Sequence, residues 1–550
     1  MGVTGVEAHL ERPRDPSHGD WATNVALVLA KQLQRAPRQI AEELRDRLQG
    51  AVPGVESIQV AGPGFLNFRL SAGSVAGALV EMVEAGDAWG HSSSGQGGKV
   101  IVEWVSANPT GPLHLGHGRQ AALGDAICTL LEATGWSVWR EFYYNDSGKQ
   151  MERLADSVWA RYQQACGHDA DVPEDGYQGE YVADIAADFR AAHGDRLAGD
   201  RSPEALDELR HFAVAALRAE QDRDLGEFRV RFDNHFLESS LYEEGKVEET
   251  VAKLRETGLV YEHDGATWLK TTEFGDDKDR VMMRGDGSAT YFLPDVAYHL
   301  TKWNRGFTTA INVQGSDHHG TVARVRAGLQ ALGLPEGYPE YVLHQMVRVE
   351  RDGREVKFSK RAGSYTTLHE LVHEVGVDVT RWFFLMRKPE AHLVFDLDVA
   401  TDQSDKNPVF KVQYAHARMH AIFRKAGLEA REVSPDNVDT AVLSHPIERE
   451  LIKQLEAFPE LVERAASARA PHLVCDYLEQ TAGAANAWYH AGNPSRNPEL
   501  AVLSDDPELR HARLLLARGV QTVLRNGLTL LGIEAPERMD RAELDEGAAA

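Results

Sequence analysis

The fold of this chain is decided by residues 99–117, which read KVIVEWVSANPTGPLHLGH. The first seven residues are an apolar, β-branched run that is typical of a buried parallel strand. A loop rich in proline and glycine follows, and a long helix begins near His117. A strand, a tight loop and a helix in this order open a nucleotide-binding α/β domain.

Two later segments, 309–313 and 341–344, have the composition of further strands of the same sheet. Between residues 146 and 265 a mostly helical, acidic stretch interrupts the pattern, and we interpret it as an insertion between two halves of the sheet. Residues 98–400 are therefore predicted to form a Rossmann-type, parallel-sheet catalytic domain with a helical insertion.

The segments on either side of this domain have other patterns. Within residues 1–97, a helical pattern over 37–48 is followed by short strand patterns over 57–60 and 65–70, which predicts a small α+β domain. Residues 401–550 show helical periodicity throughout and are predicted to be an all-α bundle. Three domains agree with a length of 550 residues, at roughly 100–200 residues per domain.

Composition and charge exclude little beyond membrane proteins. Hydrophobic residues make up 43% and charged residues 26%, as in ordinary globular proteins. No apolar run is long enough to span a bilayer and the N-terminus does not resemble a signal peptide, so we expect a cytoplasmic protein without a membrane partner. A net charge of −25 argues against a polyanionic partner, but a local basic stripe is enough to bind phosphates.

The three cysteines, Cys128, Cys166 and Cys475, are far apart in the sequence and form no C-x-x-C pair. We therefore expect reduced, partly buried thiols, and neither a disulfide framework nor a structural metal.

The four residues His114-Leu115-Gly116-His117 carry the first candidate chemistry. At the start of a helix, backbone N–H groups and the helix dipole favour anions, and Gly116 lets a nucleotide approach the backbone closely. Two imidazoles three residues apart could both donate hydrogen bonds as charge builds on an α-phosphate. Taken alone, the motif fits two histidines that cap a helix equally well.

The second candidate segment is Lys357-Phe358-Ser359-Lys360-Arg361. Two lysines on a glycine-punctuated loop could close on the β- and γ-phosphates of ATP and stabilise a pyrophosphate leaving group. Alone, a solvated basic loop explains it better. The pair of motifs is more specific, because each follows a predicted strand and parallel sheets bind ligands at that edge.

Together the two motifs resemble the HIGH and KMSKS signatures of class I aminoacyl-tRNA synthetases. The wider sequence resembles the arginyl-tRNA synthetase family over nearly the whole chain. Four dispersed stretches carry this resemblance: GDWATN at 19–24, VEWVSANPTGPL at 102–113, GSDHHG at 315–320 and NPVFKVQYAHAR at 407–418. This chain departs from the signatures at Leu115, Phe358 and Arg361, where the signatures have isoleucine, methionine and serine.

The resemblance implies that L-arginine and ATP form arginyl-adenylate, with Mg²⁺ accompanying ATP, and that the arginyl group then passes to tRNA(Arg). It also implies a monomer. The catalytic residues would be His114, Gly116, His117, Lys357 and Lys360. ATP would be bound by His114, His117, Lys357, Ser359 and Lys360, with Met346 and Val347 beside the adenine; a plain core strand at 345–347 is nearly as good an interpretation.

A guanidinium group requires planar acceptors, so we expect a carboxylate to read the arginine side chain. The resemblance places substrate contacts on Glu103, Asn108, Tyr291 and Asp295. Asp295 and Tyr291 are expected at the guanidinium, and Asn108 with Asp317 at the α-amino and carboxylate end. The alternative for Asp295 is an acid that stabilises a helix N-terminus after Pro294.

The helical C-terminal domain would bind the anticodon, and the N-terminal domain would also contact tRNA. Aromatic and amide side chains suit unstacked bases, which makes Asn407, Tyr414 and Met539 the candidates. Met539 as ordinary packing is an equally good interpretation.

Several rival functions fit the sequence less well. A cysteinyl enzyme needs clustered zinc ligands, leucyl, isoleucyl and valyl enzymes need a large editing insertion, and a glutamyl enzyme needs basic groups in its side-chain pocket. A pantothenate ligase would not need so long a helical tail. A non-catalytic RNA-binding relative would not need His114, His117, Lys357 and Lys360 intact.

Overall fold

The computed structural model describes residues 6–539 apart from 14, 147, 357–364 and 494. At its centre is a five-stranded, all-parallel sheet in the order β11-β10-β4-β5-β6. The chain adds β5 and β6 on one side of β4, and β10 and β11 on the other. The strand order therefore reverses between β4 and β10, which is where such sheets bind ligands. The strands are β4 (Lys99–Glu103), β5 (Ser137–Tyr144), β6 (Asn234–Leu237), β10 (Thr309–Gly315) and β11 (Glu340–His344).

These strands confirm the prediction of a Rossmann-type parallel sheet with helical additions. The segments predicted as strands at 99–105, 309–313 and 341–344 are β4, β10 and β11. The sequence did not reveal β6, a strand of four residues that lies inside the stretch 146–265 and forms one edge of the sheet.

The long helix α4 (Leu115–Ala133) packs against the sheet and is buried along most of its length. Its close contact depends on Gly124, because a Cβ at this position would lie 2.2 Å from Cγ of the buried Trp104 ring. The contact is therefore possible only with glycine at this position.

We expect Gly124→Ala to destabilise the fold by about 1–3 kcal/mol, since the added methyl group overpacks a rigid core. The midpoint of urea unfolding measures the effect. A matched control is Gly226→Ala in α7, where a Cβ would meet nothing within 4 Å; there the change should be neutral or stabilising by up to about 1 kcal/mol. Equal destabilisation by both variants would contradict the packing argument.

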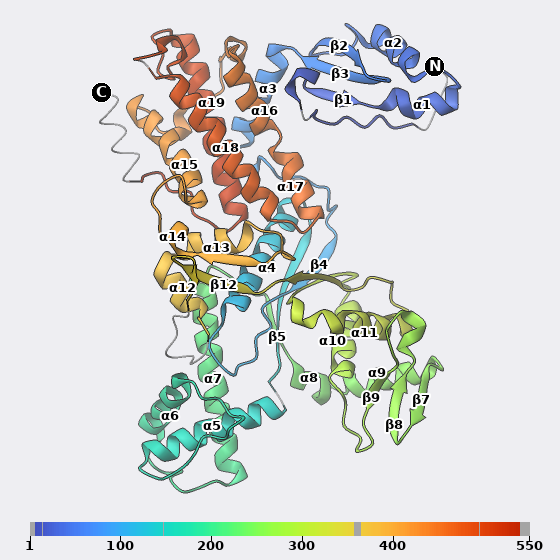
Figure 1. Ribbon diagram of the computed structural model, residues 1–550, viewed down its shortest axis with the longest axis vertical. Coiled ribbons are helices and arrows are strands. Elements are labelled where there is room, and N and C mark those ends of the chain that lie inside the picture. Colours follow the sequence, from blue (N-terminus) through green and yellow to red (C-terminus); the bar gives the residue numbers. More distant parts are fainter. Residues whose placement is uncertain (1–5, 14, 147, 357–364, 494, 540–550) are drawn as a thin grey trace.

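Helices α5, α6 and α7 form a unit that extends from the sheet and has its own apolar core (Figure 1). A second group, α8, α9 and strands β7 to β9, shares another apolar core with α10 and α11. The helices of the first unit are α5 (Lys149–Ala165), α6 (Glu180–His193) and α7 (Pro203–Glu227). The elements around the second core are α8 (Glu238–Glu243), α9 (Lys246–Glu256), β7 (Val260–His263), β8 (Ala266–Leu269), β9 (Arg280–Met283), α10 (Phe292–Asn304) and α11 (His319–Ala331).

The N-terminal part is an antiparallel sheet in the order β1-β3-β2 with two helices on it. The predicted helix over 37–48 is found as α2 with those bounds. Helix α3 instead packs against α16 and α19 of the C-terminal bundle, so it connects the two parts (Figure 1). The elements are β1 (Trp21–Thr23), α1 (Val25–Leu33), α2 (Pro37–Leu48), β2 (Val55–Ala61), β3 (Phe65–Leu70) and α3 (Ala72–Ala85).

The C-terminal part begins with a small sheet, β13-β12-β14, and continues as the predicted helical bundle. Among the described residues, no helix is both long and apolar enough to cross a membrane. The elements are β12 (Val347–Arg351), β13 (Arg354–Glu355), α12 (Leu368–Val375), α13 (Val377–Leu385), β14 (Leu393–Asp396), α14 (Leu397–Ala400), α15 (Pro408–Lys425), α16 (Pro446–Glu456), α17 (Phe458–Ser467), α18 (His472–Ala491) and α19 (Pro507–Leu530).

Arg381 of α13 is fully buried where the sheet domain meets the bundle. Its guanidinium lies 2.6 Å from the carboxylate of Asp125 in α4. It also donates to the carbonyl of Leu531 at the end of α19, at 2.9 Å, and to that of Phe228 after α7, at 3.0 Å. One side chain thus joins four segments of the chain.

Candidate active site

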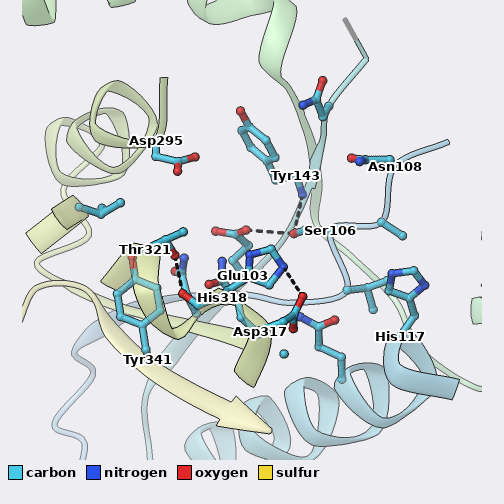
Figure 2. Close-up of a pocket in the computed structure, with 18 of the residues that line it drawn as sticks. Glu103, Ser106, Asn108, His117, Tyr143, Asp295, Asp317, His318, Thr321 and Tyr341 are labelled. Carbon is cyan, nitrogen blue, oxygen red and sulfur yellow. Dashed lines mark hydrogen bonds and ion pairs between the residues drawn. The ribbon is translucent and has the colours of Figure 1, made fainter. Parts of the chain in front are cut away.

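A cavity of about 540 Å³ opens at the C-terminal ends of β4, β10 and β11, at the point where the strand order reverses. Its walls come from residues 103–108 after β4, the first turns of α4 and α10, and the segment 312–318 at the end of β10. Figure 2 shows Asp295 and His117 on opposite sides of this space, with Glu103 between them. The cavity volume suits a substrate of small-molecule size.

The first motif forms the N-terminus of α4. His114 is the N-cap, and its Nδ1 accepts a hydrogen bond from the backbone N–H of His117 at 3.2 Å. In return, Nδ1 of His117 accepts from the backbone N–H of His114 at 3.4 Å, and the two rings stack with centroids 3.6 Å apart. The motif therefore caps the helix, as one interpretation of the sequence predicted, and it also lines the cavity; its contact with a phosphate stays a prediction.

The two capping hydrogen bonds determine which nitrogen of each imidazole carries the proton. Because each Nδ1 accepts a hydrogen bond, each ring carries its proton on Nε2 when neutral. Burial lowers the pKa of His114, and it lowers that of His117 well below its usual range, with a further contribution from His114 and His344. Both rings are therefore neutral hydrogen-bond donors near pH 7.

Gly116 allows the ring of His114 to take this position. A Cβ on Gly116 would lie 2.8 Å from Cε1 and 3.0 Å from Nδ1 of His114. Gly116 thus makes room for the His114 ring, while the predicted approach of a nucleotide to its backbone stays a prediction.

The second motif lies outside the described residues: the structure says nothing of Lys357, Ser359 or Lys360. The segments that flank it are described. Before it, the N–H of Val356 donates to Val349 at 3.0 Å. After it, the N–H of Leu368 donates to Leu113 at 2.8 Å, and Thr367 pairs with His114 in an isolated β-bridge. Residues 365–368, which follow the second motif in the chain, thus lie beside the first motif.

Glu103, at the end of β4, is buried and already paired. Its Oε2 lies 2.5 Å from Nζ of the fully buried Lys302, and its Oε1 accepts from the hydroxyl of Ser106 at 3.0 Å. Lys302 also donates to Oδ1 of Asn312 at 3.1 Å. Because Lys302 neutralises its charge, Glu103 is a weaker attractor for a substrate cation than an unpaired carboxylate would be.

Asp295 is the carboxylate without such a partner. It lies in the first turn of α10 and lines the cavity, and among the described residues it makes no ion pair. Its pKa is raised to about 7, mainly by burial. The nearby carboxylates of Glu238 and Glu103 add to the rise, and their effect outweighs the opposite effect of Arg324 and Lys302. A substrate cation placed beside Asp295 would favour its charged form.

The remaining predicted substrate residues lie at the rim. Tyr291 precedes α10 and is 72% exposed. Asn108 donates to the side chain of Gln150 at 2.6 Å, and the exposed carboxylate of Asp317 lies 3.5 Å from His318. All three line the cavity, so the structure brings together every predicted arginine contact.

Of the two residues predicted beside the adenine, the structure places only Met346 in the cavity lining. Met346 lines the cavity and is 61% exposed. Val347 is not part of the lining, and it pairs with Leu393 in the parallel ladder of β12 and β14. The structure thus favours the strand interpretation for Val347.

Sequence reasoning missed several lining or supporting side chains, among them Lys302, Tyr143 and Glu238. The hydroxyl of Tyr143 donates to Glu238 at 2.8 Å, so both face the same space from separate elements. No motif marks them; only the alternation of β5 could have suggested that Tyr143 lies on one face of the sheet.

The predicted tRNA contacts lie on and near α15. Asn407 is 3% exposed and caps this helix, and its amide donates to the carbonyl of Ala400 at 3.0 Å. Tyr414 is buried and forms a small apolar cluster with Phe410 and Met539. In this structure, therefore, Asn407 is the N-cap of α15, and Met539 packs in the apolar cluster.

Known families of proteins match three successive parts of the chain. Residues 2–70 match the arginyl tRNA synthetase N terminal domain, residues 79–383 the catalytic domain of tRNA synthetases class I (R), and residues 412–539 the DALR anticodon binding domain.

Curated relatives match over almost the full length. An arginine–tRNA ligase of Bordetella petrii is 51% identical over 96% of this chain and 95% of its own, and one of Geobacter metallireducens is 52% identical over 96% and 94%. The solved structure of the Thermus thermophilus arginyl-tRNA synthetase superposes with a TM-score of 0.76 at 27% identity, covering 98% of this chain and 97% of its own. A putative arginyl-tRNA synthetase from Campylobacter jejuni gives 0.78 at 30% identity, covering 86% of this chain and all of its own.

Proposed function

The chain belongs to the arginyl-tRNA synthetase family, and from this premise we propose how its cavity carries out the reaction. As an arginine–tRNA ligase, it uses ATP to join L-arginine to tRNA(Arg). The observation that carries our proposal is the placement of the neutral His114–His117 pair and the unpaired Asp295 on opposite sides of one cavity.

Arginine would bind with its guanidinium against Asp295 and Tyr291, and with its α-amino and carboxylate groups toward Asn108 and Asp317. This orientation places the carboxylate on the side of the cavity nearer α4. Glu103, held by Lys302, would form the floor beneath the aliphatic part and contribute residual negative potential.

ATP would bind with its phosphates at the N-terminus of α4, where the helix dipole and the Nε2–H groups of His114 and His117 favour anions. Met346 would lie beside the adenine. The arginine carboxylate would attack the α-phosphorus, forming the arginyl-adenylate and breaking the bond to pyrophosphate. Lys357, Ser359 and Lys360 would then stabilise the departing phosphates; Thr367, which follows them in the chain, lies beside His114 and supports this placement.

Mg²⁺ would enter bound to the phosphates of ATP, since this ion keeps phosphate and water ligands more readily than a protein cage. The exposed carboxylate of Asp317 at the cavity rim has suitable chemistry to accept a hydrated ion.

In the second step, a hydroxyl of the terminal tRNA ribose would attack the arginyl carbonyl and release AMP. We propose that residues 1–97 and 401–550 are tRNA-binding domains around a catalytic domain at 98–400. An unstacked base would meet the cluster of Phe410, Tyr414 and Met539 at its partly exposed members, Phe410 and Met539, while Asn407 caps the start of the helix. We also infer a cytoplasmic monomer, which sedimentation and cell fractionation test.

The proposal predicts which amino acid drives ATP–pyrophosphate exchange. With tRNA(Arg) present, arginine should support exchange, while glutamate and cysteine should not, because only a cation satisfies Asp295. The same assay without tRNA shows whether activation depends on it. Exchange driven by an acidic or neutral amino acid would overturn the assignment of the cavity.

The raised pKa of Asp295 predicts how arginine binding depends on pH. Arginine binds the ionised carboxylate, so affinity should be complete above the pKa of about 7 and should be lost as the pH falls through it. Between pH 8 and pH 6 the dissociation constant should rise about tenfold, since the ionised fraction falls by that factor. Calorimetric titration of arginine at each pH measures this, and a flat profile would contradict the role of Asp295.

A further inference from the structure

Outside the cavity, four potential metal ligands meet between helices α7 and α12. Asp224 and Glu227 are three residues apart on α7, and His369 and His373 are four residues apart on α12. Each pair therefore lies on one face of its helix. The C-terminal end of α7 lies beside α12 (Figure 1). The carboxylates of α7 and the imidazoles of α12 face each other there.

The distances suit convergence on one ion. Nδ1 of His369 lies 3.5 Å from Oδ1 of Asp224 and 3.8 Å from Oε2 of Glu227. Nε2 of His373 lies 3.5 Å from Oε1 of Glu227, and one ligand atom from each of Glu227, His369 and His373 can be chosen so that all lie within 4.8 Å of one another. Ligands of a tetrahedral Zn²⁺ are about 3.3–3.5 Å apart, so small side-chain rotations would complete the shell.

Asp224 gives an independent reason to place a cation here. The residue is 8% exposed, and its Oδ2 is buried without a hydrogen-bond donor among the described residues. A buried carboxylate oxygen without a partner is costly, and a bound cation would satisfy it.

We propose that Asp224, Glu227, His369 and His373 form a binding site for one divalent transition-metal ion, with Zn²⁺ as the best fit. Two imidazoles with carboxylates match the ligand preference of Zn²⁺, whereas Mg²⁺ prefers oxygen ligands alone. The site is therefore distinct from the magnesium that accompanies ATP. Counting cysteines could not reveal it, because its ligands are histidines and acids from two helices.

The ion would stabilise the position of residues 108–114, the loop that leads into the first motif. On α7, Gln221 donates to the carbonyls of Asn108 and Gly111 at 3.1 and 3.0 Å. On α12, the N–H of Leu368 donates to Leu113 at 2.8 Å. An ion that ties α7 to α12 thus fixes the two supports of residues 108–114 without touching the substrate.

A metal titration of the full-length protein tests the site. The parent should carry Cys166→Ser, because Cys166 is partly exposed and lies 3.5 Å from Asp195, which makes it an alternative place for Zn²⁺. With a competing chelator, the metal-free parent should bind one equivalent of Zn²⁺, which excess Mg²⁺ does not displace. With Co²⁺ it should show the visible absorption bands of a tetrahedral site.

His369→Ala and His373→Ala should each weaken Zn²⁺ binding by about tenfold to a hundredfold or more. The matched control is His211→Ala, which removes an exposed histidine on α7 that lies 3.2 Å from Asp207. It should leave the affinity unchanged. Absence of a stoichiometric equivalent in the parent, or equal weakening by His211→Ala, would overturn the site.

Hydrogen exchange tests whether the ion stabilises this loop. In the parent, Zn²⁺ should slow amide exchange in peptides covering 108–114 and 367–375, and this effect should be absent in His369→Ala. Binding of Zn²⁺ with unchanged exchange in these peptides would refute the stabilising role.

Discussion

His117→Ala is expected to lower the rate of arginyl-adenylate formation by roughly two to three orders of magnitude. The neutral ring presents an Nε2–H toward the cavity, and the loss of one preorganised donor to a developing phosphate charge has an effect of this size. Pre-steady-state formation of the adenylate, or pyrophosphate exchange with saturating arginine, measures it. Binding of tRNA should change little, because His117 lies in the first turn of α4 and lines the cavity, whereas the proposed anticodon contacts belong to α15 and its neighbours.

The variant also removes one half of the cap on α4, and this must be separated from the chemistry. Loss of a cap costs about 0.5–2 kcal/mol of stability. His445→Ala is a suitable control, because His445 forms a reciprocal capping box at the start of α16 in the bundle. It should destabilise the protein similarly and leave adenylate formation intact. Full arginine-dependent activity in His117→Ala would show the proposed mechanism to be wrong.

The second large effect is expected from Asp295→Asn, which should lower kcat/KM for arginine by roughly two to three orders of magnitude. The guanidinium would then enter a partly desolvated site without its counter-charge, and breaking such a pair costs about 3–5 kcal/mol. Steady-state kinetics over arginine concentration measure the loss, which should appear mainly in KM. The tenfold change of affinity between pH 6 and pH 8 should disappear in the same variant.

The control for Asp295→Asn is the resistance of the variant to urea, which shows whether the residue has a structural role. In the free protein, the pKa of Asp295 is raised above its unfolded value, so the ionised carboxylate opposes folding as the pH rises from about 4 to about 7. The variant should therefore resist urea better than the wild type at pH 8 and equally well near pH 4. A variant that is less stable at pH 8 would indicate a structural role for Asp295 instead.

Much of the fold follows from local sequence patterns. The β-branched run at 99–105 and the proline-led helix α2 are specified by a few neighbouring residues, and both appear in the structure. β6 is different, because four residues carry too little periodicity to be recognised, and its place is set by pairing with β5.

In the candidate site, too, some residues follow from local sequence motifs and others only from tertiary packing. His114 and Asp295 could be proposed because they lie in motifs or beside them. Lys302 is one lysine on an ordinary amphipathic helix, and its burial against Glu103 arises only when α10 packs on the sheet. Tertiary packing thus determined which of two predicted carboxylates remains unpaired.

Arg381 has a mechanical consequence. Its three hydrogen-bond partners connect the end of α19 in the helical bundle with α4, the helix whose N-terminus holds both histidines. A rotation of the bundle against the sheet must either carry α4 with it or break a buried ion pair, which is costly. Movement of the bundle relative to the sheet would therefore act on the helix that positions His114 and His117.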